Sequence, residues 1–226
     1  MSIEQKILAS EAIVEASIPA PQSAILARHL GCADYAATVQ AMRDFTLQRT
    51  AQTTDELWLV EHPPVYTLGV AARAQHLPRA DNGIPVVKTD RGGQITYHGP
   101  GQIVIYLLLD LQRRKLTVRP LVRLMENAVI DLLAGFGVVA SGRVDAPGVY
   151  AGDAKIAALG LRIRNGRCYH GLALNVDMDL SPFHAIDPCG YAGLAVTQTR
   201  DLGIADKVDA VSAKLSGYLE TRLRSY

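Results

Sequence analysis

The sequence is poor in features that mark several classes of protein. Its 226 residues include 3 cysteines and 1 tryptophan, and its 23 basic residues nearly balance its 22 acidic ones. An odd number of widely spaced cysteines (Cys32, Cys168 and Cys189) gives neither a disulfide framework nor a zinc motif. The chain also has no run of like charge, so it lacks the electrostatic signature of a nucleic-acid binder or a polybasic membrane anchor.

Long hydrophobic runs are missing as well. The apolar stretch Ile103–Leu109 has the length of a strand, far below the ~20 residues that a membrane-spanning helix needs. Charged residues interrupt the N-terminus, for example at Glu4 and Lys6, so the apolar core of a secretory signal is absent. We therefore expect a cytoplasmic protein, with neither membrane nor nucleic acid among its partners.

The most informative segment that the chain does have is polar and rich in glycine: Arg91-Gly-Gly-Gln-Ile-Thr-Tyr-His-Gly-Pro-Gly-Gln102. Glycine loses more backbone freedom on folding than any other residue, so four glycines in a plain connector would be costly. Such a loop suits a backbone that passes close to a ligand, with its polar side chains as contacts. A glycine-rich hairpin or bulge without function is the alternative.

Hydrophobic spacing predicts a mixture of helices and strands without regular alternation, which indicates an α+β fold. Residues 1–22 end in Ile18-Pro-Ala-Pro21 and are predicted to be a flexible tail, followed by a single domain over residues 23–226. Helices are expected over 33–48, around 121–132 and over 208–219, and strands over 24–30, 56–61, 65–68, 86–88 and 102–109.

A β-hairpin is predicted at Asn165-Gly166, a strong turn signal. A two-residue turn there places Ile163 opposite Cys168, and Leu161 opposite His170. Strand alternation then assigns one set of side chains to an apolar face and another to solvent. The apolar set is Leu159, Leu161, Ile163, Cys168, His170 and Leu172, and the solvent set is Arg162, Arg164, Arg167 and Tyr169. An unbroken strand also turns Lys155 to the apolar face, beside His170, whereas a bulge near Gly160 would reverse this assignment.

Cys189 is the candidate nucleophile, because it lies in the turn-like sequence Asp187-Pro-Cys-Gly-Tyr191. A thiol needs a base or a cation nearby to react as the thiolate, and an inward-facing Lys155 could supply it. The alternative is an unreactive loop cysteine. His62, His98 and His170 could in principle hold zinc, but they lack the short spacing of metal ligands, so no metal is expected. Neither a phosphate-binding loop nor a Gly-x-Ser-x-Gly motif occurs.

Four segments in this order resemble the lipoyl(octanoyl) transferase family. They are Arg91–Gln102 as quoted above, Lys155-Ile-Ala-Ala-Leu-Gly-Leu-Arg-Ile-Arg164, His170-Gly-Leu-Ala-Leu-Asn-Val176 and Asp187-Pro-Cys-Gly-Tyr-Ala-Gly193. The resemblance covers roughly residues 24 to 220. One departure is Ala158, where the family often has serine before the Leu-Gly pair; a backbone contact at this site would leave the change with little effect.

The resemblance implies a fold like the biotin and lipoate protein ligase catalytic domain, a mixed, largely antiparallel sheet flanked by helices. It implies transfer of an octanoyl group from octanoyl-acyl carrier protein to a lysine of lipoyl domains, in 2-oxoacid dehydrogenases and the glycine cleavage H protein. This is the first step of protein lipoylation, and it needs no cofactor or metal. We expect a monomer.

Residue by residue, the resemblance makes Cys189 the acyl-thioester nucleophile and Lys155 its activating partner, a cysteine-lysine dyad. The implied substrate contacts are Arg91, Gly92, Gly93, Gln94, Ile95, Thr96, Tyr97, His98, Ala158, Leu159, Gly160, Gly171, Leu172 and Ala173. Backbone amides near Cys189 or in Leu159-Gly160 are candidate oxyanion donors, with His98 or His170 as assistants.

Three other functions remain open from the sequence. An ATP-dependent lipoate or biotin protein ligase on the same fold would not need Cys189. A non-catalytic module that binds acyl carrier protein would need neither Cys189 nor Lys155. A cysteine hydrolase would release the free acid without an acceptor.

Overall fold

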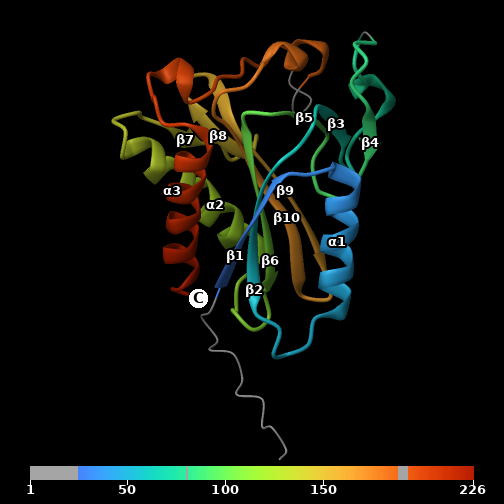
Figure 1. Cartoon of the computed structure of the whole chain (residues 1–226), viewed down its shortest axis with the longest axis vertical. Helices are drawn as coiled ribbons and strands as arrows, with labels where there is room; N and C mark the ends of the chain where they lie inside the picture. Colours follow the sequence, from blue (N-terminus) through green and yellow to red (C-terminus); the bar gives the residue numbers. More distant parts are fainter. Residues whose placement is uncertain (1–24, 80, 188–192) are drawn as a thin grey trace, which may run out of the picture.

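The computed structural model describes residues 25–79, 81–187 and 193–226. The predicted flexible tail, residues 1–22, therefore lies outside the described residues, and so does Cys189. Within the described part of the chain, a twisted seven-stranded sheet stands at the centre, with helices on both faces (Figure 1).

The seven strands follow the spatial order β1-β2-β6-β10-β9-β8-β7. Their bounds are Ile25–Cys32 (β1), Asp55–Glu61 (β2), Gln102–Asp110 (β6), Arg167–Asn175 (β10), Ala154–Arg164 (β9), Gly148–Ala151 (β8) and Ser141–Gly142 (β7). Within this sheet β1 and β2 pair in parallel, and the other neighbours are antiparallel. The prediction of a mixed, largely antiparallel sheet flanked by helices is confirmed.

A smaller three-stranded sheet, with the order β4-β3-β5, forms the wall that carries the glycine-rich segment. Its strands are Val65–Leu68 (β3), Val86–Lys88 (β4) and Ile95–His98 (β5). The bounds predicted for β3 and β4 are confirmed. The segment that we predicted as one loop contains β5, which is stabilised by pairing with β3, a partner about 30 residues earlier in the chain. Such long-range pairing overrides the local glycine signal.

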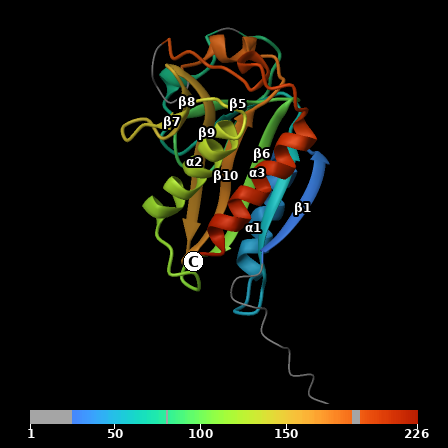
Figure 2. The same ribbon diagram turned by 90° about the vertical axis from the view of Figure 1, so that its left-hand side faces the viewer.

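Three α-helices of the described chain cover the large sheet, as seen in Figures 1 and 2. Helix α1 (Tyr35–Gln48) packs on one face, and helices α2 (Val118–Ala134) and α3 (Val208–Leu223) lie side by side on the other. Helix α1 begins after Asp34, whose carboxylate accepts a hydrogen bond from the Ala37 amide at 2.8 Å. Helix α2 has Pro120 in its first turn and ends before Gly135. The loops contain three short 3-10 helices within the described residues: η2 (Ala74–His76) after β3, η3 (Ser181–Ala185) after β10, and η5 (Arg200–Leu202) before α3.

The hairpin register is confirmed: Ile163 pairs with Cys168, and Leu161 pairs with His170. Asn165 and Gly166 both have positive φ, at 50° and 73°, as a tight two-residue turn requires. No irregularity interrupts the pairing of β9 with β10 at Gly160, so the bulge considered above does not occur there.

Two facing predictions for the hairpin are wrong. Tyr169 is 3% exposed, because helix α1 covers the face that we assigned to solvent. His170 has a φ of 64°, which turns its imidazole out of the strand alternation, and its contacts are Asp90, Tyr106 and Tyr169 on the α1 side. Positive φ in a residue other than glycine has no local sequence signal here.

Lys155 does not lie beside His170 either. The residue opposite His170 is Leu161, six positions further along β9 than Lys155. At ~3.3 Å per residue this places the two side chains about 20 Å apart along the strand. Lys155 and His170 are therefore far apart along the sheet.

Candidate active site

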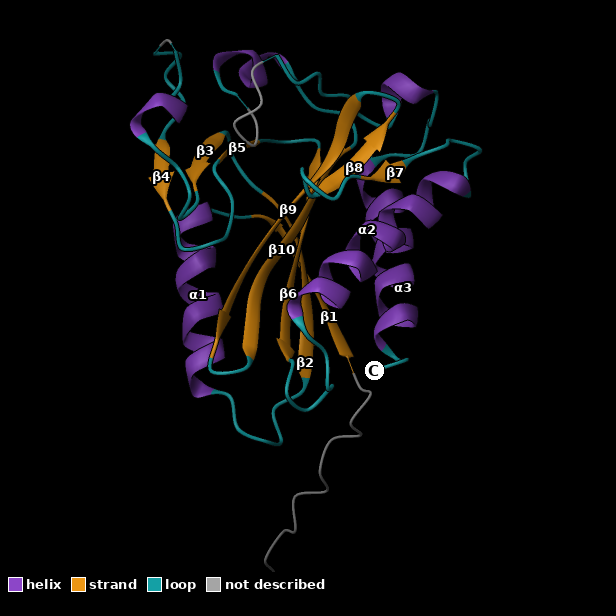
Figure 3. Cartoon of the chain, turned by 180° about the vertical axis from the view of Figure 1, so that it is seen from behind, coloured by secondary structure: helices purple, strands orange, loops and turns teal. Residues whose placement is uncertain are grey.

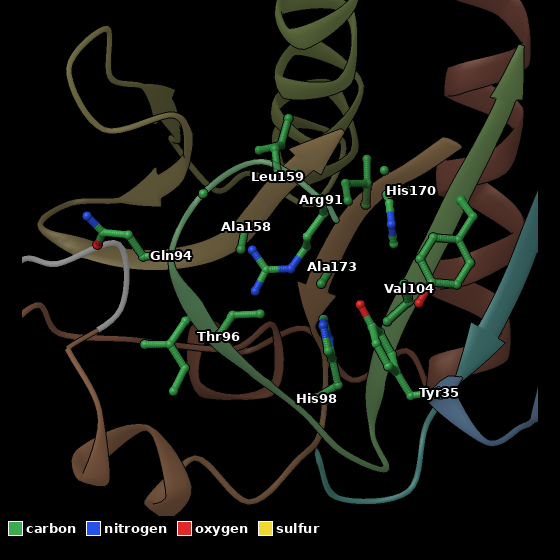
Figure 4. A pocket seen from close by; sticks show the side chains of 16 residues that line it. Tyr35, Arg91, Gln94, Thr96, His98, Val104, Ala158, Leu159, His170 and Ala173 are labelled. Carbon is green, nitrogen blue, oxygen red and sulfur yellow. The ribbon is translucent and has the colours of Figure 1, made fainter. Parts of the chain in front are cut away.

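A pocket opens between the glycine-rich segment and strands β9 and β10, with side chains of β6 and Tyr35, the first residue of helix α1, on one side (Figure 4). It encloses about 50 Å³, or about 500 Å³ when the open space at its mouth is included, so it is a narrow pocket. The lining residues are Tyr35, Arg91, Gly93, Gln94, Ile95, Thr96, His98, Val104, Tyr106, Ala158, Leu159, Gly160, His170, Gly171, Leu172 and Ala173. All of the predicted substrate contacts except Gly92 and Tyr97 line this pocket.

The two exceptions have structural explanations. The Gly92 amide donates to the Leu161 carbonyl at 2.8 Å, so Gly92 ties the segment to β9 and lines the next hollow. Tyr97 points to the opposite side of β5 from Thr96 and His98, as strand alternation requires. Its ring packs 5.5 Å from Phe183, between ring centroids, in a separate apolar cluster.

Arg91 places a buried guanidinium in the middle of the pocket, where Figure 4 shows it. Only 8% of Arg91 is exposed. Its Nη2 donates to the Thr67 carbonyl at 2.6 Å and to the Thr67 hydroxyl at 2.8 Å, and Nη1 donates to the Gly92 carbonyl at 3.0 Å. Because β3 and the glycine-rich segment both hold it, this positive charge is fixed rather than mobile. It can favour negative charge that develops on a bound substrate.

His98 is a neutral hydrogen-bonding group. Burial, and then the neighbouring His62, lower the pKa of His98 to about 3. Its Nδ1 donates to Gln102 Oε1 at 2.6 Å, so Nε2 is left as an acceptor. Gln102 in turn donates to Asn175 Oδ1 at 2.9 Å, and Asn175 Nδ2 donates to the Thr197 carbonyl at 2.9 Å. A chain of hydrogen bonds thus fixes His98 and runs toward residues 195–197.

This geometry bears on the histidines that we expected as oxyanion assistants. The N–H of neutral His98 is committed to Gln102. His170 Nε2 lies 3.0 Å from the Asp90 carboxylate, so the N–H of His170 is committed there. Burial lowers the pKa of His170 although Asp90 opposes this shift. Neutral imidazoles with occupied N–H groups cannot donate to an oxyanion.

Asp90 is held as a carboxylate by its neighbours. Burial opposes its ionisation, but hydrogen bonds from His170, Tyr169 and Arg43 prevail and hold the pKa of Asp90 well below its usual range. The Tyr169 hydroxyl lies 2.5 Å from Asp90. The carboxylate therefore fixes the position and tautomer of His170 at the edge of the pocket.

Lys155 lies in β9, three residues before Ala158, and is 3% exposed. Its Nζ donates to the Pro147 carbonyl at 3.0 Å and lies 5.5 Å from the centre of the Tyr150 ring. A Cβ atom at Gly148 would come within 2.5 Å of Lys155 Cε, so a glycine there leaves room for the lysine. Lys155 lines a small hollow that shares Thr96 and Ala158 with the main pocket. The ammonium group is thus a neighbour of the pocket mouth.

The backbone of Lys155 is joined to the segment that follows Cys189. The Lys155 amide donates to the Ala195 carbonyl at 2.8 Å, and the Thr197 amide donates to the Lys155 carbonyl at 3.0 Å, which forms a parallel bridge with Val196. Cys189 itself lies outside the described residues, so its predicted pairing with Lys155 stays a prediction.

Four lining residues were not among the predicted contacts: Tyr35, Val104, Tyr106 and His170. Val104 and Tyr106 alternate on the predicted strand β6, and this spacing was a usable signal. Tyr35 begins a helix that is distant in sequence, and His170 reaches the pocket through its positive φ. Neither of these has a local signal.

Two further features of the described residues concern membranes and metals. No helix there is long and apolar enough to cross a bilayer. No group of three or more histidine, cysteine, aspartate or glutamate side chains in the described ranges is arranged to hold a metal ion.

Comparison with known proteins agrees with this fold. Residues 35–218 match the model of the lipoyl protein ligase A/B catalytic domain, and the chain belongs to that family. Among solved structures, a lipoate protein ligase described as putative, from T. acidophilum, superposes with a TM-score of 0.69 at 18% identity, covering 88% of this chain and 84% of the other. A biotin protein ligase from Aquifex aeolicus has a TM-score of 0.59 at 11% identity, covering 88% and 71%. These two similarities show the fold alone.

Relatives of higher sequence identity are octanoyltransferases. An octanoyltransferase of Aromatoleum aromaticum is 61% identical over 209 residues, covering 92% of this chain and 90% of the relative. An octanoyltransferase of Dechloromonas aromatica is 63% identical over 196 residues, covering 87% and 95%. The resemblance found in the four sequence segments is confirmed, and the chain is an enzyme of the acyltransferase class.

Proposed function

We propose that this protein transfers an octanoyl group from octanoyl-acyl carrier protein to a lysine of lipoyl domains, through a thioester on Cys189. The observation that carries the proposal is the pocket: the predicted contacts converge on it from three segments, and Lys155 lies beside its mouth. Relatives at about 60% identity are octanoyltransferases, which supports the choice of acyl group.

In the first step, the Cys189 thiolate attacks the thioester carbonyl of the donor. A bond forms between Sγ and the carbonyl carbon, and the bond from that carbon to the carrier's phosphopantetheine sulfur breaks. The leaving thiolate takes up a proton. Lys155 favours the Cys189 thiolate by its positive charge, and the bridge from Lys155 to Val196, seven residues beyond Cys189, supports their approach.

In the second step, the neutral amine of the acceptor lysine attacks the acyl-enzyme. The carbon–nitrogen bond forms, the carbon–Sγ bond breaks, and Cys189 returns to the thiolate while the amine loses a proton. Both steps pass through an oxyanion. The fixed guanidinium of Arg91 can stabilise it, and so can whichever backbone amide of Leu159 and Gly160 points away from the ladder with β10.

The partners follow from this chemistry. The donor is octanoyl-acyl carrier protein, and the acceptors are lipoyl domains of 2-oxoacid dehydrogenases and the glycine cleavage H protein. No metal or nucleotide takes part, because the donor thioester is already activated. We place the reaction in the cytoplasm and expect a monomer; free Cys32 and Cys168 fit a reducing compartment.

The test is the intact mass of the enzyme after brief incubation with octanoyl-acyl carrier protein, without ATP. We expect one octanoyl group on the wild type and none on Cys189→Ser, with the exposed Cys32 replaced by serine as the matched control. Addition of a lipoyl domain should discharge the adduct and acylate the domain.

Three results would contradict the proposal, one for each rival function. ATP-dependent modification of a lipoyl domain by free octanoate would indicate a ligase. Rapid release of octanoate without an acceptor would indicate a hydrolase. Full transfer by Cys189→Ala and Lys155→Ala would leave only a binding module.

A further inference from the structure

The two ends of the pocket differ in exposure. Gln94, Thr96 and Ala158 are half-buried and form the mouth, on the side of Lys155. Tyr35 and His170 are buried, with 3% and 1% of their surface exposed, and form the inner end. An acyl chain whose carbonyl is held at the mouth therefore points its terminal carbon toward Tyr35 and His170.

The inner end offers an unpartnered acceptor. Neutral His170 carries its proton on Nε2, which donates to Asp90 at 3.0 Å, so Nδ1 has a free lone pair. This Nδ1 is fully buried and makes no hydrogen bond within the described chain. The backbone of His170 is in the left-handed region, with a φ of 64°, an uncommon conformation for a residue with a side chain. That conformation turns the imidazole toward the pocket.

A hydroxyl lies at the same end. The Tyr35 ring stacks on His98, with 5.7 Å between ring centroids, and Figure 4 shows its hydroxyl directed into the pocket. The Thr67 and Thr89 side chains lie close to this buried hydroxyl, but no group in the described ranges meets hydrogen-bond geometry with it. Buried polar atoms are nearly always paired in folded proteins. Two unpaired ones at the end of one pocket indicate a place for a ligand atom that pairs with them.

We propose that the inner end is a polar subsite for the terminus of the acyl chain, formed by His170 Nδ1 and the Tyr35 hydroxyl. It accepts chains of octanoyl length whose last carbon carries a hydrogen-bond donor, the class of ω-hydroxyacyl thioesters. It also disfavours longer saturated chains, because their extra methylenes would cover both polar atoms without pairing them. This subsite rests on the proposed acyl transfer and adds a second specificity to it.

The test compares three donors on one enzyme sample: the carrier-protein thioesters of octanoate, 8-hydroxyoctanoate and dodecanoate. The readout is the ratio of kcat/KM values for transfer to a lipoyl domain, a ratio that does not depend on the fraction of folded enzyme. We expect the wild type to use the hydroxylated donor within about threefold of octanoyl, and dodecanoyl far more slowly.

Two variants remove the polar atoms. Tyr35→Phe deletes the hydroxyl alone, and His170→Asn removes the imidazole while keeping a residue that tolerates positive φ. Each should lower the ratio of hydroxylated to plain octanoyl donor by about tenfold, and Tyr35→Phe should raise relative use of dodecanoyl. Tyr218→Phe, on helix α3 at the other face of the sheet, is the matched control and should change no ratio.

The outcomes distinguish failure of the polar subsite from failure of the proposed acyl transfer. If the wild type transfers octanoyl but rejects the hydroxylated donor about a hundredfold, or if both variants keep the wild-type ratios, the polar subsite is refuted and the acyl transfer stands. If the wild type transfers none of the three acyl groups to a lipoyl domain, the proposed function itself is wrong.

Discussion

The two faces of the seven-stranded sheet differ in what they bury. The face under α2 and α3 buries a mainly aliphatic cluster that includes Ile103, Leu107 and Leu109. The other face lies under α1 (Figure 3). It buries aromatic side chains, among them Tyr106, with the histidines that contact them, and it contains the inner end of the pocket. Consecutive residues of β6 thus belong to different environments. The first face packs aliphatic side chains, and the second holds polar groups such as His98 and His170 in fixed positions.

The sharpest comparison is between Ile103 and Val104, neighbours on β6 that face opposite sides. Ile103→Ala should lower the free energy of unfolding by about 2–4 kcal/mol, because it empties a site in the aliphatic cluster that is 1% exposed. Val104→Ala removes less surface and should cost about 1–2 kcal/mol. Urea denaturation measures both values.

Their effects on activity should run in the opposite order. Val104 lines the pocket, so Val104→Ala should change the relative kcat/KM of octanoyl and longer donors, whereas Ile103→Ala should leave it within twofold. Equal changes in both variants would contradict the claim that only the α1 face determines the preference among acyl donors.

Acidification should lower the free energy of unfolding through the buried histidines of the α1 face. Burial lowers the pKa values of His62, His98 and His170, that of His98 to about 3, so the folded state keeps these groups neutral. The unfolded chain takes up protons below pH 6.5, and stability therefore falls as the pH drops from there. His98 alone should account for about 2 kcal/mol between pH 7 and 5. Asp90, whose pKa is lowered, loses its contribution only at lower pH, below 3.8.

The measurement is the free energy of unfolding at several pH values for the wild type and His98→Gln. The variant should show a shallower fall between pH 7 and 5. A parallel fall in both proteins would place the acid sensitivity elsewhere in the molecule.

Tyr106→Phe tests the polar contacts of the same face. The Tyr106 hydroxyl lies 2.8 Å from His62 Nε2, and His62 Nδ1 donates to the Ala33 carbonyl at 2.6 Å. Loss of the hydroxyl leaves a buried acceptor unpaired, at a cost of about 1–2 kcal/mol in thermal or urea unfolding. A variant as stable as the wild type would show that this contact contributes nothing net.

The smallest effect is expected at Cys168, on the aliphatic face. Burial raises the pKa of the Cys168 thiol to about 12, and its sulfur donates to the Leu107 carbonyl at 3.2 Å. In the folded enzyme, iodoacetamide at pH 8 should leave Cys168 unmodified while it labels the exposed Cys32, as peptide mapping can show. Rapid labelling of Cys168 would contradict the packing of this face.

Sequence patterns predicted the features that depend on neighbouring residues. The Asn165-Gly166 turn fixed the register of β9 and β10, and Pro120 and Gly135 bracket helix α2 as expected. Most of the pocket lining was also predicted, but through family resemblance rather than through periodicity.

Features that depend on distant contacts were not predicted. Strand β5 exists because β3 pairs with it, and Arg91 is fixed by Thr67, 24 positions earlier. Strand β7 has only two residues, too few for a recognisable pattern, and β8 beside it was missed as well. His170 was assigned to the wrong face because alternation assumes that every residue has extended backbone, and His170 does not.

The central claim is that the acyl chain lies in the pocket on the α1 face. An octanoyl thioester with a diazirine near its last carbon, loaded on the carrier protein, tests it directly by photo-crosslinking and peptide mapping. The account predicts crosslinks to the peptides that contain Tyr35, Tyr106 and His170. Crosslinks confined to Val118, Val122 and Ile163, in the neighbouring apolar hollow, would contradict it.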